Sequence, residues 1–384
     1  MNVLAHRPIA PDPPGLHPVV IALAIFMSGL FAIVAVLVLA TRGPEERATG
    51  GTTPPVAAAG EASAVGTSGG VEANPTPAAT ALQPSHHTAT PVTIADDHVP
   101  YPASLPPLTV GIAQVKIALE DVELQIAPGV TFQSWTFAGG APGPVIHVKQ
   151  GQRVHVEMTN NGAIPHSIDF HAARIAPDRA FKDIKAGETF SFDFTANDPG
   201  VFLYHCGTPP VLAHIASGMY GAIVVDPVGG WKPKADRSYV LVGSEWYLNG
   251  DGKTAPAGLD MDKARHQQPD FVTWNGYAGQ YKDHPLAAEV GENIRFFVVA
   301  AGPSFDTDFH VVGTLLDRAF LDGDPSHVLT GAQTVAVPAG GGSVFDVHFD
   351  ENGLYPFVSH SFAAVDMGQV GLVNVGNVGG TMSH

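Results

Sequence analysis

The sequence predicts an all-β protein built from two tandem Greek-key β-sandwiches, preceded by a membrane span and a flexible linker. Short runs with alternating apolar residues begin near Leu105 and are separated by Gly, Pro, Asn and Asp about every ten residues, as in antiparallel sandwiches. Long helical periodicity is scarce. The two halves also echo each other: VKQGQRVHVEMTNNG is similar to AEVGENIRFFVVAAG, and ANDPGVFLYHC to DENGLYPFVSH. We therefore expect one sandwich over residues 105–228, a second over 229–378 and a short tail at 379–384.

An apolar run precedes this region. After a tail at 1–18, the stretch from Val19 to Ala40 is uncharged over 22 residues, which is long enough to cross a hydrocarbon core. A cleaved signal peptide is the alternative, although its apolar region would span only roughly 7 to 15 residues. Arginines flank the run on both sides, so charge does not set its orientation. We expect an uncleaved anchor at 19–40 with the large C-terminal part on the extracytoplasmic side, in the periplasm or at the outer face of the cytoplasmic membrane.

Residues 41–104 are rich in Ala, Gly, Pro and Thr and contain few large apolar side chains. Such a stretch cannot bury enough surface to offset its ordering entropy, so it should be a flexible linker.

Charge and cysteine content narrow the possible partners. The formal net charge of −17 argues against nucleic acid, which needs a basic surface, and is compatible with a small basic protein partner. Cys206 is the only cysteine in the chain, so no intrachain disulfide can form. Its thiol is therefore either an inert buried group or a ligand.

The surroundings of Cys206 favour a ligand. Cys206, His214 and Met219 follow one another as C-x7-H-x4-M, and His166 stands upstream in a separate segment. Two imidazoles, one thiolate and a weak thioether form the trigonal site that suits electron-transfer copper. The sequence thus predicts a copper site in the first sandwich.

A second group of histidines follows from the alternation of side chains along a strand. His205 is adjacent to Cys206, so the two side chains should point to opposite faces, and the odd spacing of His166 and His171 separates these two in the same way. His171 and His205 then form an incomplete metal site on the outer face. His360, at the matching place in the second half, is the candidate third ligand. A three-histidine site with an open position suits small-molecule chemistry.

Five segments in order resemble the copper-containing nitrite reductases, a family with two cupredoxin domains. They are PHSIDFHA, FLYHCG, HIASGMYG, GPSFDTDFHVVG and FVSHSF, within a likeness that covers roughly residues 100–378. The resemblance implies two tandem cupredoxin-like domains and one copper of each of two types per subunit. It also implies homotrimers in which the third histidine comes from the neighbouring subunit. By resemblance, type 1 copper would be bound by His166, Cys206, His214 and Met219, and type 2 copper by His171, His205 and the neighbour's copy of His360.

The same resemblance implies one-electron reduction of nitrite to nitric oxide and water. The electron would come from a small donor protein such as a cupredoxin or cytochrome c, and would pass through the Cys206–His205 link. Asp169 and His310 match the family's two proton-relay residues, which this proton-consuming reaction needs. Val312 matches the apolar residue that caps the substrate.

The sequence departs from the family pattern at a few positions. Ser167 replaces a common asparagine, Asp308 replaces a common serine, and Val312 is smaller than the usual isoleucine; none of these changes removes a ligand.

Two other functions remain open. A laccase-like multicopper oxidase would need paired H-x-H motifs, but Gly207 follows Cys206 and no complementary pairs exist. A non-catalytic electron carrier or copper-binding protein would keep the fold without the reaction, and the presence of both relay residues speaks against it.

Overall fold

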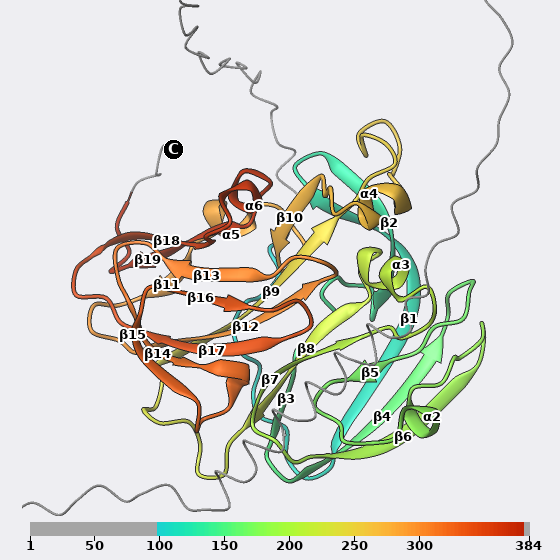
Figure 1. The fold of residues 1–384 in the computed structure, drawn as a ribbon, viewed down its shortest axis with the longest axis horizontal. Helices are drawn as coiled ribbons and strands as arrows, with labels where there is room; N and C mark the ends of the chain where they lie inside the picture. The colour runs from blue at the N-terminus through green and yellow to red at the C-terminus, as the bar shows by residue number, and fades with distance from the viewer. Residues whose placement is uncertain (1–97, 380–384) are drawn as a thin grey trace, which may run out of the picture. The chain divides into compact units, whose positions relative to one another are not determined.

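The computed structural model describes residues 98–379, which contain four β-sheets and several short helices (Figure 1). The all-β prediction is confirmed for this part of the chain. The predicted anchor at 19–40 and most of the predicted linker lie outside the described residues. Within 98–379, no helix has the length and apolar character needed to cross a membrane.

The first sandwich consists of two four-stranded sheets. One has the order β2-β1-β4-β6, with strands β1 (Ala113–Ala127), β2 (Val130–Phe137), β4 (Gln152–Asn160) and β6 (Thr189–Ala196). The other has the order β3-β8-β7-β5, with strands β3 (Ile146–Lys149), β5 (Asp169–Phe170), β7 (Gly200–His205) and β8 (Tyr220–Asp226). Two short helices lie in its loops: α2 (Pro177–Ala180) and α3 (Val211–Ala216).

The second sandwich has larger sheets. The six-stranded sheet has the order β10-β9-β12-β17-β14-β15, with β9 (Arg237–Trp246), β10 (Phe271–Trp274), β12 (Ile294–Gly302), β14 (Leu316–Phe320), β15 (Val328–Ala332) and β17 (Gly342–Val347). The five-stranded sheet has the order β11-β19-β18-β13-β16, with β11 (Leu286–Ala288), β13 (Thr307–Val311), β16 (Thr334–Val337), β18 (Gly353–Ser359) and β19 (Val370–Val375). Its helical segments are α4 (Met261–Arg265), α5 (Gln280–Asp283), α6 (Phe362–Asp366) and the 3₁₀ turn η1 (Leu321–Gly323).

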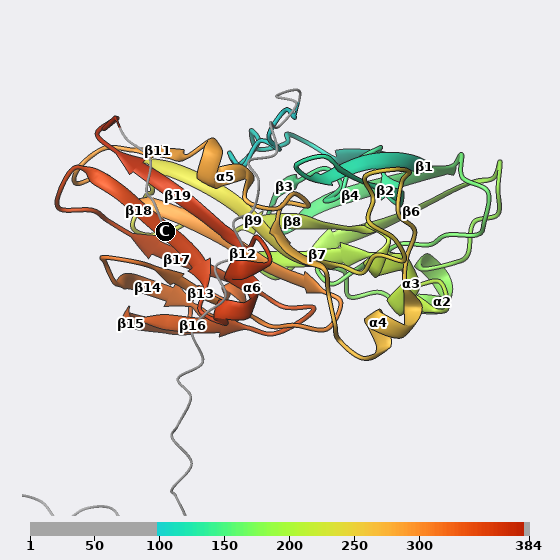
Figure 2. The ribbon, with the colours of Figure 1, turned by 90° about the horizontal axis from the view of Figure 1, so that it is seen from above.

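The two sandwiches lie side by side (Figure 2). They share an apolar core in addition to the core inside each one. Along β7, Val201 and Leu203 point into the shared core, whereas Phe202 and Tyr204 point into the core of the first sandwich. The sheet that contains β7 is therefore covered on both faces. This explains why β7 reads as a nearly continuous apolar run, since both of its faces are buried.

Residues 98–104, which composition assigns to the linker, pack against the second sandwich. The backbone N–H of Tyr101 donates to Oε1 of Gln280 over 2.8 Å, and the N–H of Val240 donates to the carbonyl of Ala103 over 2.7 Å. Ala103 is buried in the core of that sandwich. This short stretch is anchored by contacts distant in the sequence, which local composition does not reveal.

A buried ion pair joins the neighbouring strands β12 and β17. The Arg295 guanidinium donates two hydrogen bonds, of 2.7 and 2.8 Å, to the carboxylate of Asp346, and a third of 2.9 Å to the carbonyl of Pro233. The two side chains are 2% and 0% exposed. Loss of one partner would leave an uncompensated charge in the core, which is far more costly than loss of an exposed pair.

We expect Asp346→Asn to lower the free energy of unfolding by about 3–5 kcal/mol, because the Arg295 charge stays buried without its partner. Urea denaturation followed by tryptophan fluorescence measures this loss. The matched control is Asp198→Asn, which removes the partner of the exposed Arg174 and should cost about 0–1 kcal/mol. Equal losses of unfolding free energy in the two variants would contradict the role of Arg295 and Asp346 as a buried ion pair.

Candidate metal centres

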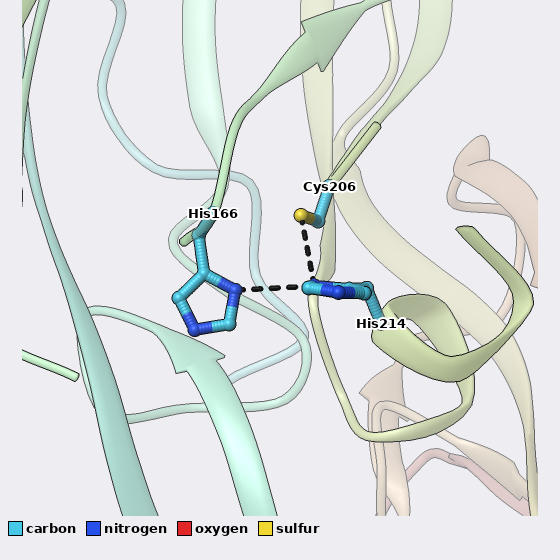
Figure 3. A group of neighbouring side chains, drawn as sticks. All are labelled: His166, Cys206 and His214. Carbon is cyan, nitrogen blue, oxygen red and sulfur yellow. Dashed lines mark hydrogen bonds between the residues drawn. The ribbon is translucent and has the colours of Figure 1, made fainter. Parts of the chain in front are cut away.

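Three side chains from separate segments meet inside the first sandwich (Figure 3). His166 precedes β5, Cys206 follows β7, and His214 lies on α3. Nδ1 of His214 lies 3.1 Å from Nδ1 of His166 and 3.2 Å from Sγ of Cys206. All three residues are buried. The structure thus brings together three of the four predicted type 1 ligands with their donor atoms facing one another.

Backbone hydrogen bonds hold this cluster in place. The N–H of Cys206 donates to the carbonyl of Met219, and the N–H of Met219 donates to the carbonyl of His214, each over 3.1 Å. Met219 is fully buried and belongs to the same apolar core as Cys206. The N–H of Ser167 donates to Sγ of Cys206 over 3.4 Å. The fourth predicted ligand is therefore tied to two of the others through the backbone.

The apolar surroundings set the protonation of this cluster. Burial raises the pKa of the Cys206 thiol and lowers the pKa of His166. Burial, with a smaller effect from His166, lowers the pKa of His214 to about 4. Both imidazoles are therefore neutral near pH 7, as metal ligands must be. A bound cation would offset the repulsion between the imidazole lone pairs and the sulfur, which lie close together here.

A second cluster lies on the opposite face of the same strand. Nε2 of His171 lies 3.1 Å from Nε2 of His205. The Nδ1 atoms donate to backbone carbonyls, that of His171 to Gly340 and that of His205 to Cys206, each over 2.9 Å. These bonds fix the tautomer in which both Nε2 lone pairs are free to bind a metal.

Asp169 completes this group. Its carboxylate lies within 4.8 Å of the His171 and His205 ligand atoms, and Asp169 pairs with His205 across β5 and β7. Burial of the His171 ring, together with the neighbouring His205, lowers the pKa of His171. Asp169 and the Gly340 carbonyl oppose this effect. His171 therefore stays neutral near pH 7 and can act as a ligand.

The remaining predicted residues lie in the second sandwich. The ring centroids of His310 on β13 and His360 after β18 are 5.1 Å apart, and Nδ1 of His310 bonds to the carbonyl of Gln333 over 2.8 Å. His360 is exposed, and Val312 is 41% exposed. Among the described residues, His360 does not join the group of His171 and His205. The structure therefore separates the predicted type 2 ligands: His171 and half-buried His205 lie in the first sandwich, and His360 lies in the second.

Sequence reasoning missed several residues that support these clusters. The carbonyl of Gly340, which orients His171, belongs to the second sandwich. Oγ of Ser167 accepts hydrogen bonds from the N–H of Gly207 and from Oγ1 of Thr208, each over 3.1 Å. The ring of Trp135 contacts both His166 and His214. None of these residues stands at a ligand-like spacing, so only the folded chain identifies them.

Known proteins share this architecture. A multicopper oxidase family model matches residues 118–229. A copper-containing nitrite reductase of Neisseria gonorrhoeae is 38% identical over 273 residues, which cover 68% of this chain and 69% of that protein. The chain belongs to the copper-containing nitrite reductases. A solved copper nitrite reductase from Nitrosomonas europaea has 35% identity and a TM-score of 0.65, with 69% of this chain and 94% of that one covered.

A more distant relative in the same family is the copper-containing nitrite reductase of Alcaligenes faecalis, which is 30% identical over 276 residues, 66% of this chain and 71% of that protein. A solved multicopper oxidase with 24% identity and a TM-score of 0.59 shares the fold. The family resemblance predicted from the five motifs is confirmed. This family consists of copper-dependent oxidoreductases, so the chain is assigned to that class.

The lowered pKa of His214 predicts a pH dependence for the copper-free protein. The unfolded imidazole takes up a proton below about pH 6.5, but the folded one does so only below about pH 4, so stability should fall between these values by up to about 3 kcal/mol. Urea midpoints from pH 7.5 to 4 measure this loss. The variant His214→Gln should lose less over the same window, and parallel curves for the two proteins would contradict the prediction.

Proposed function

We propose that this protein reduces nitrite to nitric oxide and water with one electron from an external donor. The observation that carries the proposal is that the adjacent residues His205 and Cys206 belong to two different clusters of metal-binding side chains. Membership in the copper-containing nitrite reductases supports the same activity.

The donor sets fit copper of two kinds. A buried thiolate with two imidazoles and a buried methionine suits type 1 copper, which would be held by His166, Cys206, His214 and Met219. Imidazoles that solvent can reach, with an open side, suit type 2 copper, which would be held by His171, His205 and a third histidine. Copper at these sites would supply the electron and polarise the substrate.

Side chains of the protein would supply the protons for the reaction. Nitrite, one electron and two protons give nitric oxide and water, so the site must deliver two protons to a departing oxygen. Asp169 lies beside His171 and His205 and is placed to donate one of them. His310 would supply the other, with its Nδ1 held by the Gln333 carbonyl so that its second nitrogen stays available. Val312 would cap the nitrite.

The separation of His360 from His171 and His205 supports a homotrimer. A head-to-tail interface that closes into a ring of three would bring His171 and His205 of one subunit against His310 and His360 of the next. Each site would then contain residues from two subunits, and oligomerisation would be required for activity.

The proposal also includes the cellular location of the protein and its electron donor. The uncharged run at 19–40 would anchor the protein in the membrane, with the catalytic part in the periplasm or at the outer face of the cytoplasmic membrane. The acidic net charge favours a small basic cupredoxin or cytochrome c as donor. A non-catalytic electron carrier with the same coppers remains the alternative that activity measurements separate.

We expect Asp169→Asn to reduce nitric oxide production by about 10²–10⁴-fold, because the amide cannot donate the proton that the carboxyl group supplies. The measurement is anaerobic nitric oxide release from the copper-loaded protein with a reduced artificial donor and nitrite. Bound copper is quantified in parallel, and Asp262→Asn, at an exposed carboxylate on α4, is the control. An unaltered rate in Asp169→Asn would exclude this relay. Copper-loaded wild type that makes no nitric oxide would favour the carrier.

Mixed trimers test whether His360 acts across the interface. Chains with His205→Ala and chains with His360→Ala should each be inactive alone. When co-expressed in equal amounts, they should recover about a quarter of wild-type activity, because three quarters of random trimers are mixed and each has one intact site of three. Nitric oxide release and subunit composition are measured together. No recovery in verified mixed trimers would place the third ligand in the same chain.

A further inference from the structure

Trp135 is an aromatic neighbour of the buried cluster of His166, Cys206 and His214. Its ring centroid lies 4.9 Å from that of His214 at 47° and 5.7 Å from that of His166 at 58°. Trp135 comes from β2, in the sheet opposite the one that leads to Cys206. A single side chain thus contacts both imidazoles of the cluster.

Backbone contacts hold β2 against the segment that carries His214. The N–H of Trp135 donates to the carbonyl of Ser217 over 2.9 Å, and Oγ of Ser134 donates to the same oxygen over 2.5 Å. Ser217 is the C-terminal cap of α3. The backbone at Trp135 is therefore fixed relative to the C-terminal end of α3, the helix that carries His214.

His166 lacks the usual second contact of a histidine ligand. Such ligands donate their other ring N–H to a carbonyl or carboxylate, as His171 and His205 do here. Nε2 of His166 is buried and has no hydrogen-bond partner among the described residues. The orientation of this ring must come from packing, and Trp135 supplies an aromatic surface for it.

Exposure points to a second effect. His166 and His214 are 0% and 3% exposed, whereas Trp135 is only partly buried. The indole contacts both imidazoles and is itself partly exposed, so it shields part of their surface from solvent. An apolar group in this place keeps the local polarity low, and the shell around a metal site controls its solvent access and reduction potential.

We propose that Trp135 is a positioning residue for the type 1 site: it orients His166 and His214, keeps water from them and raises the reduction potential of the copper they bind. The inference rests on copper binding at this cluster, as proposed above. Low polarity disfavours the more highly charged oxidised ion, so loss of the ring should lower the potential. No bond changes at the indole, and the electron still comes from the external donor.

The first test compares Trp135→Ala and Trp135→Phe with wild type in the copper-loaded full-length protein without nitrite. Redox titration at the visible absorption of the thiolate–copper bond gives the potential. In Trp135→Ala we expect a lower reduction potential and a copper affinity that is lower by about tenfold or more. Both should be largely restored in Trp135→Phe. The matched control is Trp231→Phe, whose ring packs on Phe297 and Phe320 away from the cluster. An unaltered potential in copper-loaded Trp135→Ala would overturn the inference while leaving nitrite reduction untouched.

A second readout serves where Trp135→Ala fails to fold. Copper is added to the metal-free protein and tryptophan emission is recorded. Copper bound beside the indole should quench its emission, so wild type should lose more fluorescence than Trp135→Phe at equal copper occupancy. Equal losses in the two proteins would show that Trp135 is not a neighbour of the bound ion and would overturn the proposal. Absence of copper binding in wild type would overturn the proposed function itself.

Discussion

The alternation of side chains along β7 is the constraint on which the two metal centres depend. Adjacent residues of a strand must point to opposite faces, so His205 and Cys206 cannot serve the same cluster. Val201 and Leu203 establish one face of the strand, and Phe202 and Tyr204 establish the other. The packing of β7 between two cores therefore fixes which face each ligand occupies. A shift of one residue in register would exchange the two ligands.

The second sandwich contributes to a site whose histidines lie in the first. The Gly340 carbonyl that sets the tautomer of His171 lies in the turn between β16 and β17. The apolar core that joins the sandwiches, which includes residues of β7 and β12, holds this turn beside the cluster. Packing between the sandwiches thus controls the chemistry of the exposed centre, although no sequence motif spans the two.

The sequence predicted the parts of the site that depend on local periodicity. Spacing around Cys206 and the parity of His166 and His171 were enough to separate two clusters, because side chains alternate along an extended backbone. The structure forms a strand only at Asp169–Phe170 between these two histidines, which flank it. The supporting groups could not be predicted in this way. Trp135 and Gly340 reach the ligands from strands and turns far away in the sequence, and the packing of Tyr101 against Gln280 gives no local signal either. Short sequence segments thus determine which residues are ligands, whereas the tertiary fold determines how those ligands are oriented.

The two faces also give the clusters opposite environments. The cluster at Cys206 is enclosed by apolar side chains that hold its imidazoles neutral, so a copper ion bound there would exchange an electron with little rearrangement of water. The cluster at His205 has an exposed histidine and a carboxylate, so a small anion and protons can reach it. One peptide unit separates these environments. A covalent link between a dry centre and a wet one allows an electron to arrive where protons are available, which is the requirement that nitrite reduction imposes.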